Sequence, residues 1–224
     1  MAITTVDQLI AGMQYPREFI KAATPTLVAG RPHSLFYLAG APGAATGSSA
    51  GLAGEALTSY AGQLPFSNPA SGNTYLARLT GQATIAGQLV LCDRLWHNSG
   101  FSMTSTSAQT VSSAAWPARS ADGTSNGEGV LLGVEITTAT GSGTPTITVS
   151  YTNQSNSSGK SGTNSVATAA SSAIGAFYPI GLAAGDTGVR SVQTLTLSAT
   201  WTSGAMSLVA YRVLARLDLS NANT

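Results

Sequence analysis

The sequence predicts a mainly β protein: an antiparallel β-sandwich, jelly-roll-like, with a short N-terminal helix and an extended N-terminal arm. Three observations support this fold class. In the C-terminal half, apolar residues alternate with polar ones at the period of a half-buried strand. These runs are rich in the β-branched and aromatic residues that strands favour. Turn signals separate about eight to nine such runs, a spacing typical of sandwiches and jelly rolls.

The composition indicates a folded chain that carries very little charge. Of its 224 residues, 43% are hydrophobic and 8% are charged, whereas ordinary soluble domains have about 25% charged residues. Disordered chains combine low hydrophobicity with high charge, so this composition predicts a packed core. The formal net charge of +1 gives little repulsion between copies and favours self-association. The shortage of Lys and Arg argues against nucleic-acid binding.

The first residues predict a short amphipathic helix. Thr5 and Gln8 have the spacing of a capping box, and apolar residues follow at helical spacing, namely Val6, Leu9, Ile10 and Met13. Pro16 ends the helix because proline has no N–H to donate. The start lacks the pattern of a signal peptide, and no stretch of about 18 apolar residues is present to span a membrane. We therefore expect synthesis in the cytoplasm and no membrane partner.

Between Thr24 and Pro69 the chain changes character. Gly and Pro recur every few residues, and the apolar run from Ser34 to Leu38 is brief. Such a segment lacks a continuous core and is expected to lie on another surface as an extended arm or long loops. We therefore divide the chain into an N-terminal helix and docking arm, residues 1–65, and a sandwich domain, residues 66–224. Deleting the arm should leave a folded sheet domain that no longer assembles.

Two β-hairpins are predicted in the sandwich domain. The first runs from Gly129 to Tyr151, where alternating apolar residues lie on both sides of an interruption. The second joins residues 192–201 to residues 206–217 around the turn Thr202-Ser203-Gly204. Each arm of these hairpins should bury one face and leave Thr and Ser on the other.

Two further segments have distinct expectations. The nearly continuous apolar run at 87–95 predicts a strand covered on both faces, with Cys92 as a buried core thiol. The stretch at 153–172 is low in bulk and rich in Ser and Gly, which predicts an exposed loop.

No residue pattern predicts catalysis. The sequence from Gly47 to Gly51 matches G-x-S-x-G, but no apolar strand precedes it and the helical pattern after it is thin. His97 has no nucleophile in a suitable pattern, and we expect it to be a polar residue at a strand end. The acidic residues are scattered without metal-ligand spacing. The sequence thus predicts a non-enzymatic protein with no cofactor, no metal and no small-molecule substrate.

Aromatic residues raise an alternative, a carbohydrate-binding module. Flat rings can stack on sugars, and the candidates are Trp96, Trp116, Trp201, Tyr60, Tyr75 and Tyr178. Trp201 is expected in the core, whereas Trp116, beside Pro117 in a loop, is expected to be exposed. We predict an interaction surface that includes five residues of the arm and this tryptophan: Tyr15, Arg17, Phe19, Phe36, Tyr37 and Trp116.

Segments over nearly the whole chain carry a family resemblance. They read MAITTVDQLIAGM, SLFYLAGAPGAAT, LPFSNPASGNTYLARLTGQATIAGQLVLCDRLWH, GEGVLLGVEI, TVSYTNQ and LAAGDTGVRSVQTLTLS. Together they resemble structural proteins encoded in tailed bacteriophage genomes. The resemblance implies a virion component, made in the cytoplasm of the bacterial host and built into the particle. Such proteins decorate or cement capsids or belong to the tail.

These observations lead to one expected function and two alternatives. We expect a decoration or cement protein on the capsid surface, whose partners are the major capsid protein and copies of itself. A homotrimer would suit a lattice with local threefold points, and a closed ring prevents open fibres. A tail or head–tail component is the close alternative. A carbohydrate-binding module is the more distant one.

Overall fold

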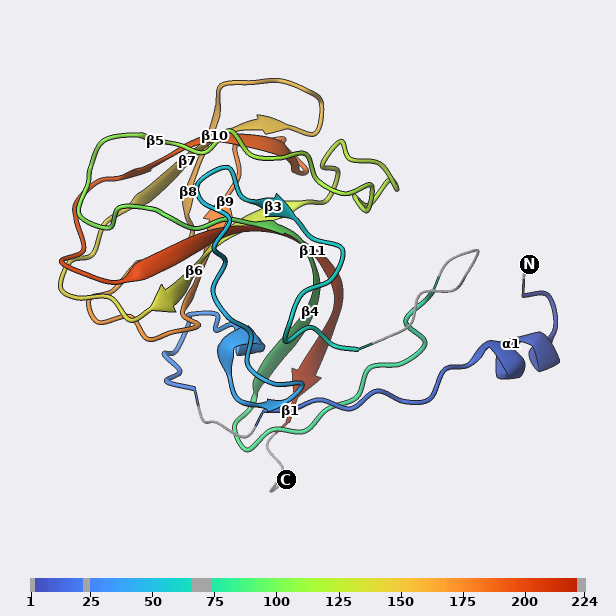
Figure 1. Ribbon diagram of the computed structural model, residues 1–224. Helices are drawn as coiled ribbons and strands as arrows, with labels where there is room; N and C mark the ends of the chain where they lie inside the picture. The colour runs from blue at the N-terminus through green and yellow to red at the C-terminus, as the bar shows by residue number, and fades with distance from the viewer. Residues whose placement is uncertain (1–2, 22–24, 66–73, 221–224) are drawn as a thin grey trace.

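The computed structural model describes residues 3–21, 25–65 and 74–220 and is mainly β, as predicted (Figure 1). The helix α1 spans Val6–Gly12, and the 3-10 helix η1 spans Leu35–Tyr37. The short strands are β1 Ile20–Lys21, β2 Gly40–Ala41, β3 Glu55–Ala56 and β5 Gln109–Thr110. The longer strands are β4 Gly87–His97, β6 Leu131–Thr138, β7 Ile147–Asn153, β8 Lys160–Asn164, β9 Phe177–Gly181, β10 Val189–Leu197 and β11 Ala205–Leu219.

Nine strands form a large curled antiparallel sheet in the order β3-β4-β11-β6-β9-β8-β7-β10-β5. The sheet folds over where β9 pairs with β8, so β4, β11, β6 and β9 form one layer and β8, β7, β10 and β5 form the other (Figure 1). Most consecutive strands alternate between the two layers. This order is compatible with the jelly-roll-like sandwich that the sequence predicts.

The two predicted hairpins are wrong, although their strands are present. β6 pairs with β11 and β9, whereas β7 pairs with β8 and β10. In the same way, β10 pairs with β7 and β5, whereas β11 pairs with β4 and β6. Both connections therefore cross from one layer to the other. Alternation identifies the face that a strand buries, but it does not identify the neighbouring strand.

Side chains from both layers fill the core. The fully or almost fully buried ones include Leu132, Val134, Ile136, Ile147, Val149, Tyr151, Val192, Leu195, Leu197, Met206, Leu208 and Ala210. Trp201 is also buried, as predicted, and its indole Nε1 donates to the carbonyl oxygen of Ala169 at 3.2 Å. Burying one large apolar side chain stabilises the fold by about 1.5–3 kcal/mol. The predicted inward face is thus confirmed for β6 and β7, whereas in β10 a register shift between Val192 and Thr194 moves the buried face to Leu195 and Leu197.

β4 and β11 continue beyond the sandwich as a two-stranded extension, which we call the distal ribbon (residues 87–93 and 212–219; Figure 1). β6 pairs with β11 only as far as Tyr211, and β3 meets β4 only at Trp96 and His97. The described strands therefore leave both edges of the ribbon unpaired. Val90 and Cys92 are exposed, so the prediction of a covered strand with a buried thiol is wrong for this half of β4.

The predicted exposed loop at 153–172 contains a strand. β8 pairs with β7 on one side and β9 on the other. Its residues are Lys, Ser, Gly, Thr and Asn, which have low apolar content. The backbone ladders of its two neighbours hold it in the sheet, because each residue offers one donor and one acceptor whatever its side chain.

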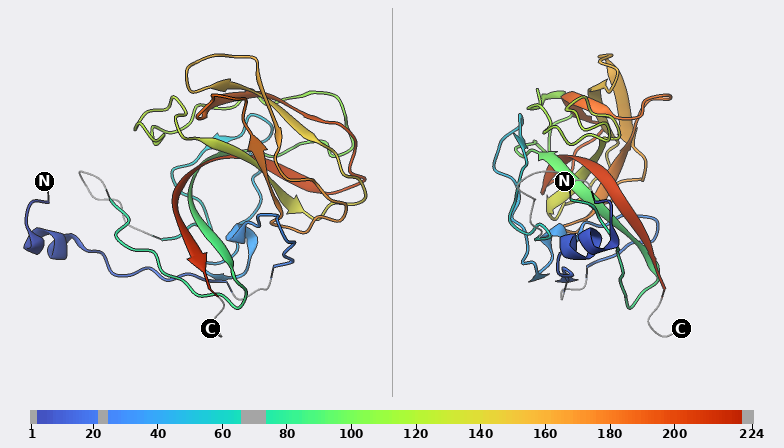
Figure 2. Two further views of the ribbon diagram at one scale, coloured as in Figure 1. Left: turned by 180° about the vertical axis from the view of Figure 1, so that it is seen from behind. Right: turned by 90° about the vertical axis from the view of Figure 1, so that its right-hand side faces the viewer.

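The N-terminal residues lie apart from the sandwich. α1 begins after Thr5, whose Oγ accepts from the N–H of Gln8, and it has no buried residue. Figure 1 and the left view of Figure 2 show α1 projecting from the body, joined to it by an extended stretch that ends in the β1–β2 pairing. No helix among the described residues is long and apolar enough to cross a membrane. The predicted domain boundary after residue 65 adjoins residues 66–73, outside the described residues, and stays a prediction.

Candidate interaction surface

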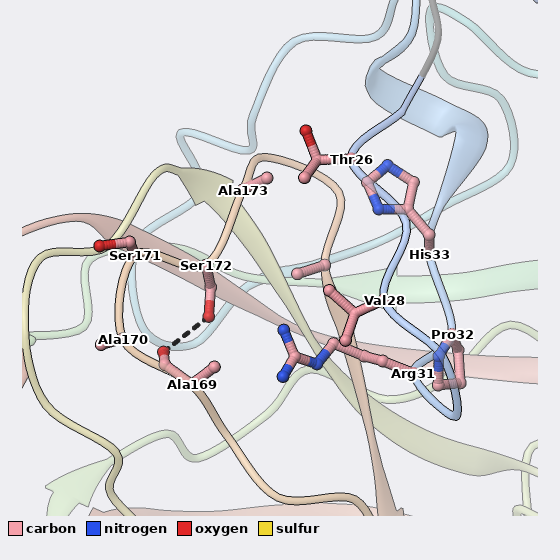
Figure 3. Close-up of a pocket in the computed structure, with 11 residues that line it drawn as sticks. Thr26, Val28, Arg31, Pro32, His33, Ala169, Ala170, Ser171, Ser172 and Ala173 are labelled. Carbon is pink, nitrogen blue, oxygen red and sulfur yellow. Dashed lines mark hydrogen bonds between the residues drawn. The ribbon is translucent and has the colours of Figure 1, made fainter.

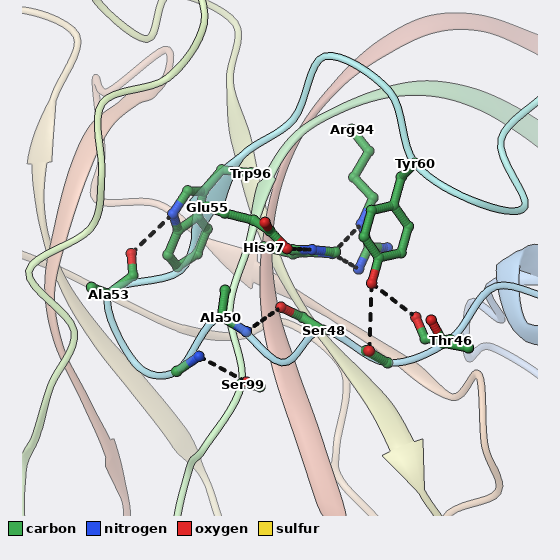
Figure 4. A network of polar contacts seen from close by, with 12 residues as sticks. Thr46, Ser48, Ala50, Ala53, Glu55, Tyr60, Arg94, Trp96, His97 and Ser99 are labelled. Atoms are coloured by element: carbon green, nitrogen blue, oxygen red, sulfur yellow. Dashed lines mark hydrogen bonds and ion pairs between the residues drawn. The ribbon is translucent and has the colours of Figure 1, made fainter.

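Part of the predicted arm is held firmly by the sandwich. This part, residues 33–60, is called the latch segment here and contacts β4 and β6. Figure 4 shows its middle part beside Arg94, Trp96 and His97. The amide of Ser34 donates to the carbonyl oxygen of Gly175 at 2.7 Å, and the amide of Leu57 donates to that of Leu95 at 2.8 Å. β3 lies within the latch segment and adds an edge strand to β4. The predicted arm therefore has two parts. The latch segment is bonded to the sandwich, whereas the N-terminal residues around α1 lie apart from it.

Trp96 fixes the middle of the latch segment. Its indole Nε1 donates to the carbonyl oxygen of Ala53 at 3.1 Å, and its ring lies 5.3 Å from the ring of Trp116. Gly54 has φ of 68°, and a Cβ at this position would meet the Trp96 ring at 2.4 Å. Only glycine combines this conformation with so close an approach. The backbone of the latch segment therefore packs directly on a core tryptophan.

A buried ion pair lies beside this contact. Glu135 is 1% exposed and accepts hydrogen bonds from Arg94 Nη1 at 2.7 Å and from Tyr37 Oη at 3.0 Å. Burial, followed by the negative charge of Glu135, raises the pKa of Tyr37 well above its usual range. Tyr37 therefore stays a hydrogen-bond donor to the carboxylate. The contact joins η1 of the latch segment to β4 and β6.

His97 extends the network at the end of β4, the strand-end position that the sequence predicts. The Nδ1 atom lies 3.3 Å from Nε and 3.1 Å from Nη2 of Arg94, and the Nε2 atom lies 2.9 Å from Glu55 Oε1 (Figure 4). Since arginine only donates, Nδ1 must accept, and Nε2 carries the proton that Glu55 accepts. Desolvation by burial lowers the pKa of His97. The geometry and the burial both favour the neutral ring.

Aromatic rings cover the network. The guanidinium of Arg94 lies 4.6 Å from the centre of the Phe36 ring, and Tyr60 meets the His97 ring edge-on at 4.6 Å. Phe36 and Tyr60 stack at 6.0 Å. Such contacts shield the charges from water and strengthen their attraction. This arrangement joins segments that are distant in sequence, so it serves to hold the latch segment in place.

A small cavity lies on another side of the latch segment. It has a volume of about 240 Å³ and is lined by two segments, residues 26–33 and 169–176 (Figure 3). Arg31 lies with its guanidinium 5.4 Å from the centre of the Tyr178 ring, and His33 Nε2 has no hydrogen-bond partner. Sites for drug-sized ligands usually have about 300–1,000 Å³. The cavity is therefore small for an organic ligand.

The six predicted interaction residues fall into three groups, of which the third is Trp116 alone. Tyr15 and Arg17 are exposed on the extended stretch after α1, and Phe19 is half-buried there. Phe36 and Tyr37 belong to the network around Glu135, so their rings already contact this chain. The structure thus leaves the first group free to meet another surface.

Trp116 requires a correction. It is 2% exposed, and its indole Nε1 donates to the carbonyl oxygen of Val189 at 2.6 Å. The neighbouring Pro117 places it in a loop, but this loop lies across the sandwich and inserts the ring into the core. The expectation of an exposed aromatic ring at this position is wrong.

The network around Glu135 was not found by sequence reasoning. One signal was present: Glu135 lies between Val134 and Ile136 in an otherwise apolar strand. A charge in such a position needs a partner, because an unpaired buried charge is costly. The partners come from separate segments, so only the folded chain identifies Arg94 and Tyr37.

The G-x-S-x-G match lies in the latch segment without the structure that the motif requires. Residues 43–49 belong to no helix or strand, a turn follows at residues 51–53, and Ser48 Oγ accepts from the amide of Ala50 at 3.2 Å. A nucleophile elbow needs a strand before it and a helix after it. Among the described residues, no group of three or more His, Cys, Asp or Glu side chains is placed to hold a metal ion.

The N-terminal residues carry a run of exposed large apolar side chains. The large apolar side chains that remain exposed there are Ile3, Val6, Leu9, Ile10, Met13, Tyr15 and Ile20.

Comparisons with known proteins add no relative, because no protein-family model, curated protein or solved structure matches the chain. Function must therefore be inferred from this surface and from the body that carries it.

Proposed function

We propose that this chain is a non-enzymatic structural protein of a tailed bacteriophage, a decoration or cement protein that binds the capsid. The observation that carries the proposal is the combination of a curled, two-layered sheet with an N-terminal segment whose apolar side chains the sheet leaves uncovered. Such a segment suits a protein that works by binding neighbours. The resemblance of several sequence segments to phage structural proteins supports the same role.

The charge content supports repeated assembly. With a net charge of +1, copies placed close together on a lattice repel one another little. Weak contacts are sufficient there, because a second contact by an already bound copy is intramolecular. A closed homotrimer would match local threefold points of a lattice. The major capsid protein and copies of the chain itself are the proposed partners.

Binding to purified capsid shells tests the proposal. Shells of the major capsid protein are mixed with the full chain, pelleted, and analysed for bound copies and for heat resistance. We expect hundreds of bound copies per shell, in proportion to the lattice, and a higher shell disruption temperature. A chain lacking residues 1–19 should bind less. Absence of binding to intact shells would contradict the proposal.

A tail or head–tail component is the second candidate, because an uncovered apolar segment could equally join tail subunits. Antibody labelling of whole particles separates the two, since a tail role predicts label at one vertex only. A carbohydrate-binding role has less support. Trp96, Trp116 and Trp201 are all buried, so these rings have no face free to stack on a sugar.

A further inference from the structure

α1 has an apolar face with no partner among the described residues. Four residues recur at helical spacing on this face, namely Val6, Leu9, Ile10 and Met13. Val6 is 71% exposed and Ile10 is 62% exposed. The helix start is well formed. The amide of Gln8 donates to Thr5 Oγ, and Gln8 Oε1 accepts from the amide of Thr4 at 2.8 Å. Helices this short are marginal in water without a packing surface.

The distal ribbon is the complementary feature. Its two faces differ. Gly81 lies against the side chains of Leu217 and Leu219, since a Cβ at this position would be 3.2 Å from each. Residues near Gly81 therefore cover the face that carries these two leucines. Val90 and Arg216 are directly opposite each other across the strands and share the other face. Val90 is 39% exposed. A two-stranded ribbon is marginally stable alone and gains from packing against a helix.

We infer that α1 of one copy packs its apolar face on the distal ribbon of a second copy. One chain supplies both uncovered surfaces, so identical copies satisfy each other. Charge is consistent with the match, because Asp7 lies in the first turn of α1 and the exposed ribbon face carries Arg216 beside Val90, with Asp218 two residues farther along the same face. The inference deepens the proposed self-association and rests on it, but it does not require a capsid.

The size of the contact argues for a closed exchange. A stable interface covers about 800 Å² on each partner, which is more than one helix of seven residues can bury. When every copy gives one helix and receives one, the buried area grows with each contact and the ring closes. Figures 1 and 2 show α1 well away from the ribbon of its own chain, as an exchange requires.

Sedimentation of the full chain over a hundredfold concentration range tests this inference. The wild type should form a closed oligomer. Ile10→Asp and Val90→Asp should each weaken association at least tenfold, because each places a charge in the apolar contact. Ala11→Asp, on the opposite side of α1, is the matched control and should associate as the wild type does. Far-UV circular dichroism checks folding, and Leu214→Asp gives a second ribbon variant.

Mixing the two variants sharpens the result. Ile10→Asp keeps an intact ribbon and Val90→Asp keeps an intact helix, so a mixture restores one helix–ribbon contact per pair and should associate more weakly than the wild type but more strongly than either variant alone at the highest concentrations. A monomeric wild type would overturn the inference, as would an oligomer unchanged by Ile10→Asp. If the helix variant dissociated the oligomer but the ribbon variants did not, α1 would dock on a surface other than the distal ribbon. This result would also overturn the inference. Shell binding by a monomer would leave the proposed capsid role standing, so the two failures are distinguishable.

Discussion

The sandwich and the N-terminal residues 3–21 contain similar apolar side chains but place them in opposite surroundings. In the sandwich, alternating Val, Leu and Ile residues are buried between two layers. In residues 3–21, the large apolar side chains from Ile3 to Tyr15 are exposed. The latch segment lies between these extremes, since it is joined to the body by hydrogen bonds and an ion pair. The body therefore accounts for the stability of the fold, and residues 3–21 carry the exposed apolar side chains that we propose for association.

The largest expected effect comes from the core. Trp96→Ala removes a fully buried ring that packs on Trp116 and supports Ala53. Cavity formation should lower the free energy of unfolding by about 4 kcal/mol, measured by chemical denaturation. Tyr15→Ala, which truncates a ring that is 89% exposed, is the matched control and should change it by less than about 0.5 kcal/mol. Similar losses in the two variants would contradict the comparison.

The next effect comes from the ion pair under the latch segment. Glu135→Gln keeps the shape of the side chain but leaves Arg94 without its buried counter-charge. We expect a loss of about 3 kcal/mol in the free energy of unfolding. Limited proteolysis should also cut residues 33–60 faster, because Tyr37 loses a charged acceptor. Resistance equal to that of the wild type would show that the backbone contacts alone hold this segment.

A smaller effect depends on pH. Burial lowers the pKa of His97, which faces Arg94, Glu55 and Glu135, so the folded chain keeps the ring neutral. The unfolded chain takes up a proton below about pH 6.5. Stability should therefore be complete above that pH and decrease as the pH falls below it, because the unfolded state binds more protons.

Chemical denaturation on both sides of this pH measures the dependence. His33, whose pKa is also lowered by burial, contributes with the same sign. His97→Gln should reduce the pH dependence, and His97→Gln with His33→Gln should reduce it further. Stability that rises on acidification through this range would show that neither ring is held neutral.

The smallest effect is expected from the N-terminal helix. Deleting residues 1–13 removes no buried side chain among those described, so the free energy of unfolding should change by less than about 0.5 kcal/mol. The measurement belongs at low concentration, where both chains are monomeric, because association would otherwise add to stability. A large loss would mean that α1 packs on its own body.

The sequence was sufficient for most of the longer strands, with β8 as the exception, but not for their neighbours. The alternation from Leu132 to Ile136 correctly identified a buried face, because the period of a strand depends on local geometry alone. The pairing of β6 with β11 depends on how layers stack, and no local pattern encodes it. Cys92 was placed wrongly for the same reason, since its strand continues past the body that would cover it.

The candidate surface could be predicted only in part. The spacing of Val6, Ile10 and Met13 and the capping box are local, so they identified α1 from the sequence alone. The distal ribbon and the Glu135 network bring together residues separated by long stretches of chain. Trp116 was misplaced because the proline beside it describes a loop but not the direction in which the ring points.

The position of β11 has a consequence for biosynthesis. β11 lies in the middle of its layer, between β4 and β6, and a hydrogen bond from Gln88 to Asp218 spans 130 residues. Until residues 205–219 have left the ribosome, β4 and β6 lack the strand that joins them. Contacts so distant in sequence are slow to form. The nascent chain must therefore keep two unpaired strand edges from aggregating until β11 is available to pair with them.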